Sequence, residues 1–319
     1  SFILTMPAEQ TSPLQAVENY FSFEKLPDNV FRTSNVFTYG SPKAAYGGLI
    51  MSQALAAAEQ TMAVEFKPHS LHSYFILNVD TTKAVSYCVR LLRDGRSFKT
   101  RSVEAVQDGN VVFCLQASFH KPEADSCVHQ FPFPATVPPA DECYPLNLAA
   151  ADLLDKLEKG ELHGSEHTRA ALARHSQVDF TKWIFDIRCT DTASLFGIGA
   201  PPGKLYFWVR SKVALPSEDD RLHRWLSLFV SDAVPALSVV RPHAKNDFSV
   251  SMLFSLDHTM HFHHPEIRTD DWLLYEIESP IAAGGRGFAH GRFWGPDGKL
   301  LASVSQEVIV RTRGEVSRL

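Results

Sequence analysis

The sequence predicts an α+β protein made of two related units, each a strongly curved antiparallel sheet wrapped around one apolar helix. Both halves of the 319 residues contain a helix-like segment followed by long runs of β-branched and aromatic residues. Asp-Gly pairs, which favour hairpin turns, separate these runs. Motifs also recur about 190 residues apart, because Gly95–Phe98 (GRSF) is similar to Gly285–Phe288 (GRGF), and Asp108-Gly109 has a counterpart at Asp297-Gly298. The repeat indicates duplication of one α+β unit.

The first unit is predicted to span residues 13–120. Its helix is expected over Ala45–Met62, a segment rich in Ala, Leu and Met that contains the pair Gly47-Gly48. Strand-like segments follow at 69–79, 84–109 and 110–120, and Asp94-Gly95 marks a turn within the second of them. The expected order is therefore a helix and then a meander of long strands.

The second unit is predicted to span residues 177–312 and to repeat this order. Its helix is expected over Leu222–Ala233 and ends before Pro235. This segment is apolar nearly all round, which is typical of a helix buried on every side. Four strand-like segments follow, at 248–263, 272–281, 286–298 and 299–311.

Residues 121–176 are predicted to be a linker, because they begin with an extended stretch rich in Pro and acidic residues. A short helix is expected at 146–164 within it. The tail 313–319 ends in Ser317-Arg318-Leu319, which is similar to the peroxisomal address Ser-Lys-Leu.

Composition excludes several classes of protein. A net charge of −5 with 21 % charged residues gives no basic stripe of the kind that nucleic acid requires. Apolar runs stay below the roughly 18 residues of a membrane helix, and the four apolar residues near the N-terminus are too few for a signal peptide. The five cysteines form no CxxC pair, which favours free thiols over a disulfide framework or a zinc ribbon.

Asp232 is the first candidate site residue, because it interrupts the apolar stretch Trp225–Leu237 (WLSLFVSDAVPAL). On a helical period it shares a face with Trp225, Leu228 and Phe229. A carboxylate in such surroundings is unfavourable unless it is hydrogen-bonded. Two interpretations stay open here: a helix-end carboxylate in contact with solvent, and a functional acid.

Gln306 and Ser255 are less distinctive. Alternation places Gln306 in a row of apolar residues that runs from Leu300 to Val310, so it is either a hydrogen-bonded core amide or a functional group. Alternation places Ser255 on the polar face of its strand, where contact with solvent is the ordinary expectation unless a bulge intervenes.

Other motifs argue against further chemistries. His258, His261, His263 and His264 are close in sequence, but no acidic or Cys partner completes a metal site. A Gly-x-Ser-x-Gly elbow, a Walker A loop and a Gly-x-Gly-x-x-Gly motif are all missing. No cofactor and no metal are therefore expected.

Together, six motifs resemble those of the type II acyl-CoA thioesterases, and in particular the peroxisomal branch of that family. The resemblance covers about Val36 to Arg311 and depends on the segments 46–55 (YGGLIMSQAL), 68–75 (PHSLHSYF), 91–98 (LLRDGRSF), 231–237 (SDAVPAL), 255–263 (SLDHTMHFH) and 303–307 (SVSQE). It implies a double hot-dog fold and hydrolysis of acyl-CoA thioesters to a free acid and CoA.

The resemblance also implies residue roles. An Asp, a Ser or Thr, and a Gln orient the attacking water in this family, and they correspond to Asp232, Ser255 and Gln306. The helix start at Gly47 and Gly48 would bind the oxyanion, although a plain turn before a helix explains these glycines equally well. Two further groups follow from the hairpin and helix positions. Arg93, Arg96 and Arg286 would contact the CoA phosphates, with solvated turn charges as the alternative. Met51, Leu55 and Phe229 would line an acyl tunnel, with ordinary core packing as the alternative.

Two alternative functions were weighed. An enoyl-CoA hydratase or dehydratase of the same fold would use an Asp and a His, for which Asp257 and His258 are candidates, whereas a non-catalytic acyl-CoA-binding module would need no catalytic set. The expected partners are the acyl-CoA substrate, a peroxisomal import receptor that recognises Ser317-Arg318-Leu319, and another copy of the chain in a homo-oligomer. The expected location is the peroxisomal matrix, with the cytoplasm as the alternative.

Overall fold

The computed structural model describes residues 12–38, 45–178, 183–199, 203–246, 248 and 250–312. The predicted tail 313–319, which includes Ser317-Arg318-Leu319, lies outside these residues. The first half of the chain contains α1 (Pro13–Tyr20), β1 (Glu24–Leu26), β2 (Val30–Thr33), α2 (Gly47–Glu59), β3 (Lys67–Phe75), β4 (Val85–Asp94), β5 (Phe98–Gln107) and β6 (Asn110–His120).

The second half repeats this order with additional helices. It contains η1 (Ala140–Glu142), α3 (Leu146–Glu158), α4 (Glu166–Ser176), β7 (Phe185–Cys189), α5 (Thr192–Leu195), β8 (Lys204–Ser211), α6 (Asp220–Ser231), α7 (Pro235–Val240), η3 (Arg241–Asn246), β9 (Val250–Ser255), β10 (Asp257–Phe262), β11 (Leu273–Ala283), β12 (Arg286–Trp294) and β13 (Leu300–Thr312).

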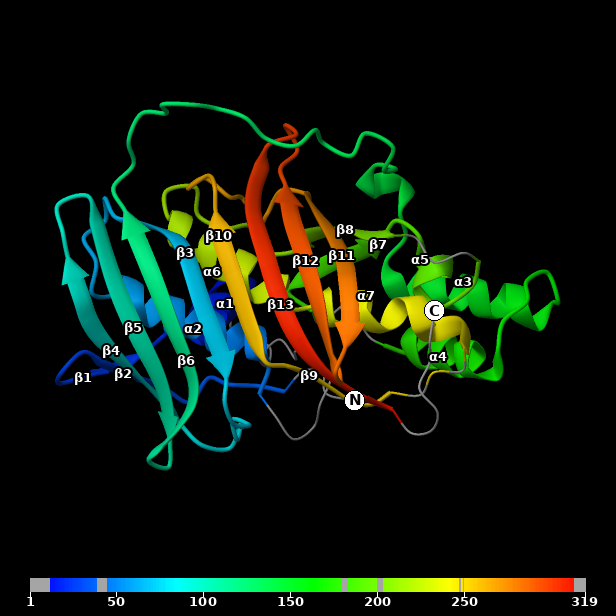
Figure 1. Ribbon diagram of the computed structural model, residues 1–319, viewed down its shortest axis with the longest axis horizontal. Helices are drawn as coiled ribbons and strands as arrows, with labels where there is room; N and C mark the ends of the chain where they lie inside the picture. Colours follow the sequence, from blue (N-terminus) through cyan, green and yellow to red (C-terminus); the bar gives the residue numbers. More distant parts are fainter. Residues whose placement is uncertain are drawn as a thin grey trace.

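The strands of the described residues form one antiparallel sheet, in the order β1-β2-β4-β5-β6-β3-β10-β13-β12-β11-β8-β7, with β9 paired to β13 (Figure 1). The predicted α+β fold and its internal duplication are confirmed, since the order of strands on one side of the β3·β10 junction mirrors the order on the other. The two predicted sheets meet edge to edge: β3 and β10 pair antiparallel, with Asp257 opposite Tyr74 and His261 opposite Ser70.

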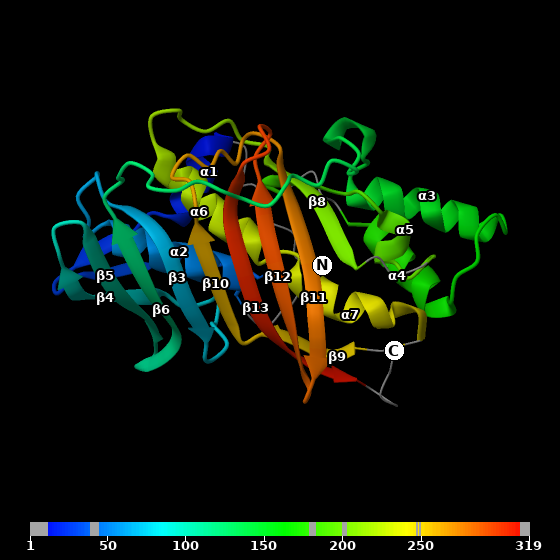
Figure 2. The ribbon, with the colours of Figure 1, turned by 45° about the horizontal axis from the view of Figure 1, so that its top comes forward.

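Helices α2 and α6 pack side by side and antiparallel behind this sheet (Figure 2). The first turn of α2 lies against the last turn of α6, where Gly48 meets Phe229, and Glu59 at the end of α2 contacts Trp225 near the start of α6. Both helices are buried along nearly their whole length, as the apolar sequence of the second one predicted. The duplicated units therefore place unlike helix ends next to each other.

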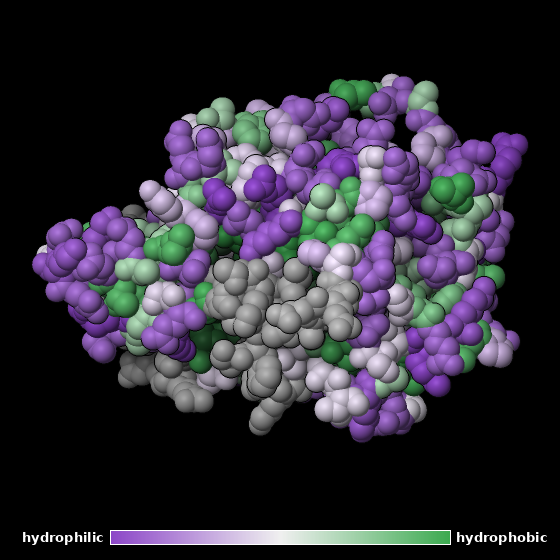
Figure 3. Space-filling view, turned by 180° about the vertical axis from the view of Figure 1, so that it is seen from behind, coloured by the Kyte–Doolittle hydropathy of each residue, from purple (hydrophilic) through white to green (hydrophobic). Residues whose placement is uncertain are grey.

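The segment after α1 covers the helix pair on its other side. The Phe21 ring lies 4.9 Å from the Trp225 ring, and the Phe37 ring lies 6.1 Å from the Phe229 ring, measured between centroids. Seen from behind, the surface is mostly hydrophilic, with hydrophobic side chains visible towards the middle (Figure 3). The helix pair is thus enclosed between the sheet and this segment.

Residues 121–139 run across the second half as an extended segment (Figure 1). Gln130 fastens this segment to the β12–β13 hairpin, because its amide donates to the Gly298 carbonyl at 2.8 Å and accepts from Leu300 N–H at 3.0 Å. The predicted helix at 146–164 is α3, which ends at Glu158 before Gly160 with φ of 75°. The division at residues 120, 176 and 312 stays a prediction.

Several elements were not predicted. β1, β2 and β8 precede the central helices, and α4 lies within the predicted linker. The first two are only three and four residues long, too short for a periodic pattern to emerge. The strand predicted over 248–263 is instead two strands, β9 and β10, separated at Leu256.

Candidate active site

The first turn of α2 comes unusually close to the end of α6. A Cβ atom at Gly48 would collide with the Phe229 carbonyl, and one at Gly47 would lie 2.9 Å from Asp232 Oδ2. The Tyr46 hydroxyl donates to the same Phe229 carbonyl at 2.7 Å, which fixes the distance between the helices. The two glycines therefore allow the α2 N-terminus, with its free N–H groups and positive dipole end, to face Asp232.

Asp232, Ser255 and Gln306 meet at this point. Asp232 caps the C-terminus of α6, Ser255 ends β9, and Gln306 lies in the middle of β13. Gln306 Nε2 donates to Asp232 Oδ1 at 2.9 Å and also to the Ser255 hydroxyl, which in turn donates to Asp232 Oδ1 at 3.3 Å. The structure thus brings together three side chains that the sequence separates by up to 74 residues.

Burial raises the pKa of Asp232 from 3.8 to about 6, because removal from water disfavours the ionised carboxylate. Hydrogen bonds from Gln306, from the Gly48 N–H and from Ser255 oppose this rise. These partners are all neutral, so they stabilise the carboxylate without pairing it to a cation. Asp232 is partly exposed, which leaves it accessible to a small molecule.

The position of Gln306 confirms the alternation predicted for its strand. Its side chain is fully buried, as are Ala302 and Val308, whereas Glu307 faces the other side of the sheet. The amide oxygen accepts from His258 Nδ1 at 3.1 Å. Both polar atoms of the buried amide therefore have hydrogen-bond partners: the nitrogen bonds to Asp232 and Ser255, and the oxygen bonds to His258.

The prediction that Ser255 lies on a solvent-facing side was wrong, because it treated residues 248–263 as one strand. Met252 and Phe254, the apolar residues that alternate with Ser255 in β9, are 42 % and 46 % exposed. At the break after β9, Leu256 bonds to two different strands: its N–H donates to Glu307 O at 2.8 Å, and its carbonyl accepts from Phe75 N–H at 3.0 Å. The break resets the alternation, and Ser255 faces Asp232 instead of solvent.

The three arginines predicted to contact CoA do not converge. Arg286 lies on β12, next to β13, and forms an ion pair at 2.8 Å with Glu307, on the face of the sheet opposite Gln306. Arg93 and Arg96 lie in the β4–β5 hairpin, where Arg101 links the Arg93 carbonyl to Thr61 just beyond the C-terminus of α2. That is the end of α2 opposite Gly48, about 18 Å away for 13 residues of helix.

Asp257 and His258, the pair that a hydratase would need, point to opposite faces of β10. The Asp257 carboxylate accepts from Glu307 N–H at 2.6 Å and is partly exposed, whereas His258 is fully buried against Gln306. One substrate atom cannot contact both side chains. The geometry therefore argues against proton shuttling by this pair.

An apolar pocket adjoins the site beside α6, and Phe229 is its one member among the three residues predicted to line a tunnel. Met51 and Leu55 are fully buried in the core instead. The pocket walls include Tyr46, Trp183, Phe185, Ile187, Phe229 and Ala233. Ala233, one of its walls, follows Asp232 directly in the chain.

Among the described residues, no cluster of three or more His, Cys, Asp or Glu side chains has the geometry of a metal site. No helix within the described ranges is both long and apolar enough to cross a bilayer.

Comparison with known proteins identifies the family. Residues 38–120 match the family model described as acyl-CoA thioesterase N-terminal domain, and residues 162–310 match the one described as acyl-CoA thioesterase C-terminal domain. Acyl-coenzyme A thioesterase 8 of Mus musculus is 34 % identical over 302 residues, which cover 94 % of this chain and 90 % of the relative. Acyl-CoA thioesterase 2 of Haemophilus influenzae is 30 % identical over 90 % of this chain and 94 % of its own.

Solved structures agree with these relatives. An acyl-CoA thioesterase II from Mycobacterium marinum superposes with a TM-score of 0.69 at 29 % identity and covers 93 % of this chain and 98 % of its own. A hot-dog protein of unknown function from Alicyclobacillus acidocaldarius, at 16 % identity, supports the fold with a TM-score of 0.71 over 94 % of this chain and 99 % of its own. The chain therefore belongs to the type II acyl-CoA thioesterase family, and it is an acyl-CoA thioesterase with a duplicated hot-dog fold.

Proposed function

We propose that Asp232, Ser255 and Gln306 hold a water molecule that attacks the thioester carbonyl directly, without an acyl-enzyme. The observation that supports this most is the convergence of the three side chains through mutual hydrogen bonds beside a helix N-terminus. No other carboxylate in the described residues lies within this group of contacts.

The proposed reaction begins with Asp232 in its ionised form. Its carboxylate takes a proton from water while the water oxygen bonds to the carbonyl carbon. Ser255 and Gln306 fix the position of that water, which removes much of the entropic barrier. The carbonyl oxygen becomes an oxyanion, then re-forms the carbonyl as the bond to sulfur breaks. The CoA thiolate leaves, and the proton on Asp232 returns to the sulfur or to solvent.

We assign the oxyanion to the N–H groups of Gly47 and Gly48, because a helix N-terminus stabilises negative charge that develops in a transition state. In the structure the Gly48 N–H donates to Asp232. A substrate oxygen that takes over this N–H would remove one of the interactions that lower the pKa of Asp232. That exchange makes the carboxylate a stronger base at the moment of attack.

For the rest of the substrate, we propose that the acyl chain enters the pocket between Tyr46 and Trp183. Contacts of Arg286 with the CoA phosphates stay a prediction, and Arg93 and Arg96 would have to act at the far end of the helix pair.

A peroxisomal location is proposed as well. A relative named peroxisomal acyl-coenzyme A thioester hydrolase 1, from Saccharomyces cerevisiae, is 27 % identical over 83 % of this chain. The Ser317-Arg318-Leu319 ending supports import by the receptor that reads such tripeptides. Self-association stays a prediction.

Thiol release from palmitoyl-CoA, measured with wild type and Asp232→Ala, tests the mechanism. We expect steady release by wild type without a burst, an intact-mass spectrum of the quenched enzyme without an acyl adduct, and little release by the variant. A trapped acyl adduct, or equal release by the two proteins, would overturn the proposal. Water addition to an enoyl-CoA would support the hydratase, and binding without turnover would support the non-catalytic alternative.

A further inference from the structure

His258 is a fully buried side chain next to the site that the proposed reaction does not use. It lies on β10 between two polar groups: Nδ1 is 3.1 Å from Gln306 Oε1, and Nε2 is 2.9 Å from the Ser231 hydroxyl. Its backbone carbonyl accepts from the Ser73 hydroxyl of β3 at 2.8 Å, so the ring position is tied to the junction between the two halves.

The hydrogen-bonding capacity of Gln306 fixes which ring nitrogen of His258 holds the proton. Gln306 Oε1 can only accept, so His258 Nδ1 holds the proton and donates it. Nε2 of the neutral ring then faces the Ser231 hydroxyl at 2.9 Å as an acceptor, and it shares the one hydrogen of that hydroxyl with the Leu228 carbonyl, to which Ser231 donates at 2.8 Å. Burial lowers the pKa of His258 to about 4, which keeps the ring neutral near pH 7.

The orientation of the Gln306 amide depends on this contact. If the amide turned over, Oε1 would face the Asp232 carboxylate, another acceptor, and the His258 proton would have to move from Nδ1 to Nε2 before the ring could accept from the amide nitrogen. In the observed orientation both hydrogens of Nε2 are used, one on Asp232 and one on Ser255. The contacts form a closed circuit from Gln306 through His258 and Ser231 to Asp232 and back to Gln306, since Ser231 and Asp232 are consecutive residues of the chain.

We propose that His258 is a positioning residue for Gln306, and that its Nδ1–H holds the amide nitrogen towards Asp232 and Ser255 where the attacking water binds. The inference rests on the proposed function, because orientation of the amide matters to turnover only if Gln306 acts on that water.

Two matched variants of His258 separate its contact to Gln306 from its contact to Ser231. The amide nitrogen of Asn reaches about the position of Nδ1, and that of Gln reaches about the position of Nε2. His258→Asn should therefore keep the contact to Gln306, whereas His258→Gln should keep only the contact to Ser231. We expect His258→Gln to lower kcat about tenfold or more with KM little changed, and His258→Asn to recover most of that loss. Melting temperatures of both variants report any purely structural effect.

A double-mutant cycle with Gln306→Ala tests whether His258 acts through the glutamine. His258→Gln should have little further effect on kcat when Gln306 is already absent. Equal fold losses from His258→Gln in the two backgrounds, or kcat no higher for His258→Asn than for His258→Gln, would overturn the inference. Wild-type turnover by Gln306→Ala alone would instead refute the proposed function, so the two failures are distinguishable.

Discussion

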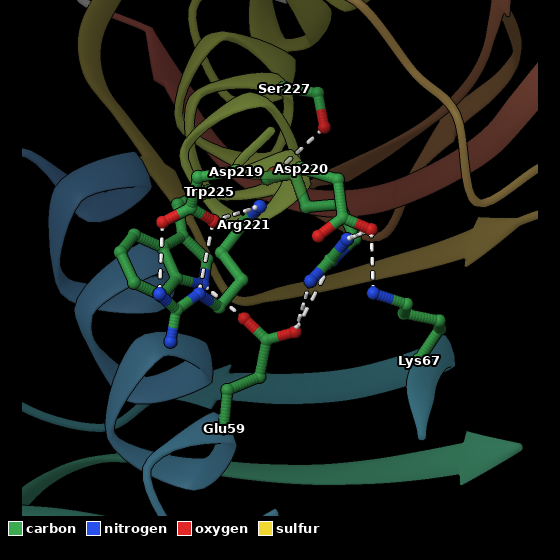
Figure 4. Close-up of polar contacts among 8 residues, drawn as sticks. Glu59, Lys67, Asp219, Asp220, Arg221, Trp225 and Ser227 are labelled. Carbon is green, nitrogen blue, oxygen red and sulfur yellow. Dashed lines mark hydrogen bonds and ion pairs between the residues drawn. The ribbon is translucent and has the colours of Figure 1, made fainter. Parts of the chain in front are cut away.

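Each end of the α2–α6 pair has a carboxylate between the two helices, and its hydrogen-bonding partners differ between the two ends. At one end, Asp232 closes α6 beside the first turn of α2 and accepts hydrogen bonds from neutral groups. At the other end, Glu59 closes α2 beside the first turns of α6, where Arg224 lies 2.8 Å from its carboxylate and Trp225 Nε1–H also donates to it (Figure 4).

The ion pairs at the Glu59 end extend outwards. Asp220 lies 2.6 Å from Arg224 and 2.8 Å from Lys67, which begins β3. Burial raises the pKa of Glu59, but the Arg224 guanidinium opposes the rise by favouring the charged form. The pKa of Glu59 is therefore raised in spite of its cationic partner, whereas Asp232 has no cationic partner and a pKa near 6. The comparison teaches that a duplicated helix pair yields a structural anchor where a cation is present and a candidate base where the partners are neutral.

The largest expected effect is on turnover when Asp232 is changed to Asn. We expect kcat to fall about 10³-fold, because the variant keeps the shape of the side chain and removes the base. The corresponding Glu59→Gln variant should keep kcat within about twofold, since Glu59 is far from the site. Thiol release measures kcat. Similar losses in both variants would show that the two carboxylates do not differ in their importance for turnover.

The free energy of unfolding should depend on Glu59, which turnover does not need. Glu59→Ala should lower the free energy of unfolding by about 3–5 kcal/mol, because it leaves Arg224 buried at 2 % exposure without its buried partner. Urea denaturation measures the loss, and the double variant with Arg224→Met is the control that should recover much of it. Unchanged stability of Glu59→Ala would show that the ion network does not anchor the helices.

Asp232 should be unfavourable for stability at neutral pH. A folded-state pKa near 6, raised from 3.8, means that the native protein loses stability as pH rises between those values, by up to about 3 kcal/mol. Asp232→Asn should therefore melt at a higher temperature than wild type at pH 8, with a smaller difference at pH 4. A lower melting temperature at pH 8 would contradict a desolvated, unpaired carboxylate.

The pH dependence of turnover follows from the same value. Because the ionised form is the active one, kcat/KM should be level above pH 6 and fall about tenfold per pH unit below it. Glu59→Gln should leave this midpoint unchanged. A midpoint near 4 would mean that the interior does not raise the pKa of the base.

The smallest effect is expected at the outer edge of the ion network. Lys67 is 23 % exposed and pairs with Asp220, which is 36 % exposed, so solvent screens the pair. Lys67→Met should change the free energy of unfolding by less than about 1 kcal/mol. A loss as large as that for Glu59→Ala would place the anchor at the surface instead of the helix interface.

Much of the site could be predicted because its members break local patterns. Asp232 interrupts an apolar helix, and Gln306 interrupts an apolar strand row. The same signal was present for His258, which shares the spacing of Met260 and Phe262 and is buried as they are. From the sequence, however, His258 was considered only as one of four histidines that could bind a metal and, with Asp257, as a hydratase candidate. Ser255 could not be assigned from alternation, since the break at Leu256 depends on hydrogen bonds to two other strands.

The sequence by itself determined that the chain has two similar units, that each has one buried helix, and which family it belongs to. Apolar spacing and turn residues act locally, so they can be read without a structure. Only the tertiary structure decided that β3 pairs with β10, that Ser255 and Gln306 meet Asp232, and that His258 lies against Gln306. These depend on antiparallel packing of the two halves, because residues far apart in sequence form hydrogen bonds only after the halves pack together.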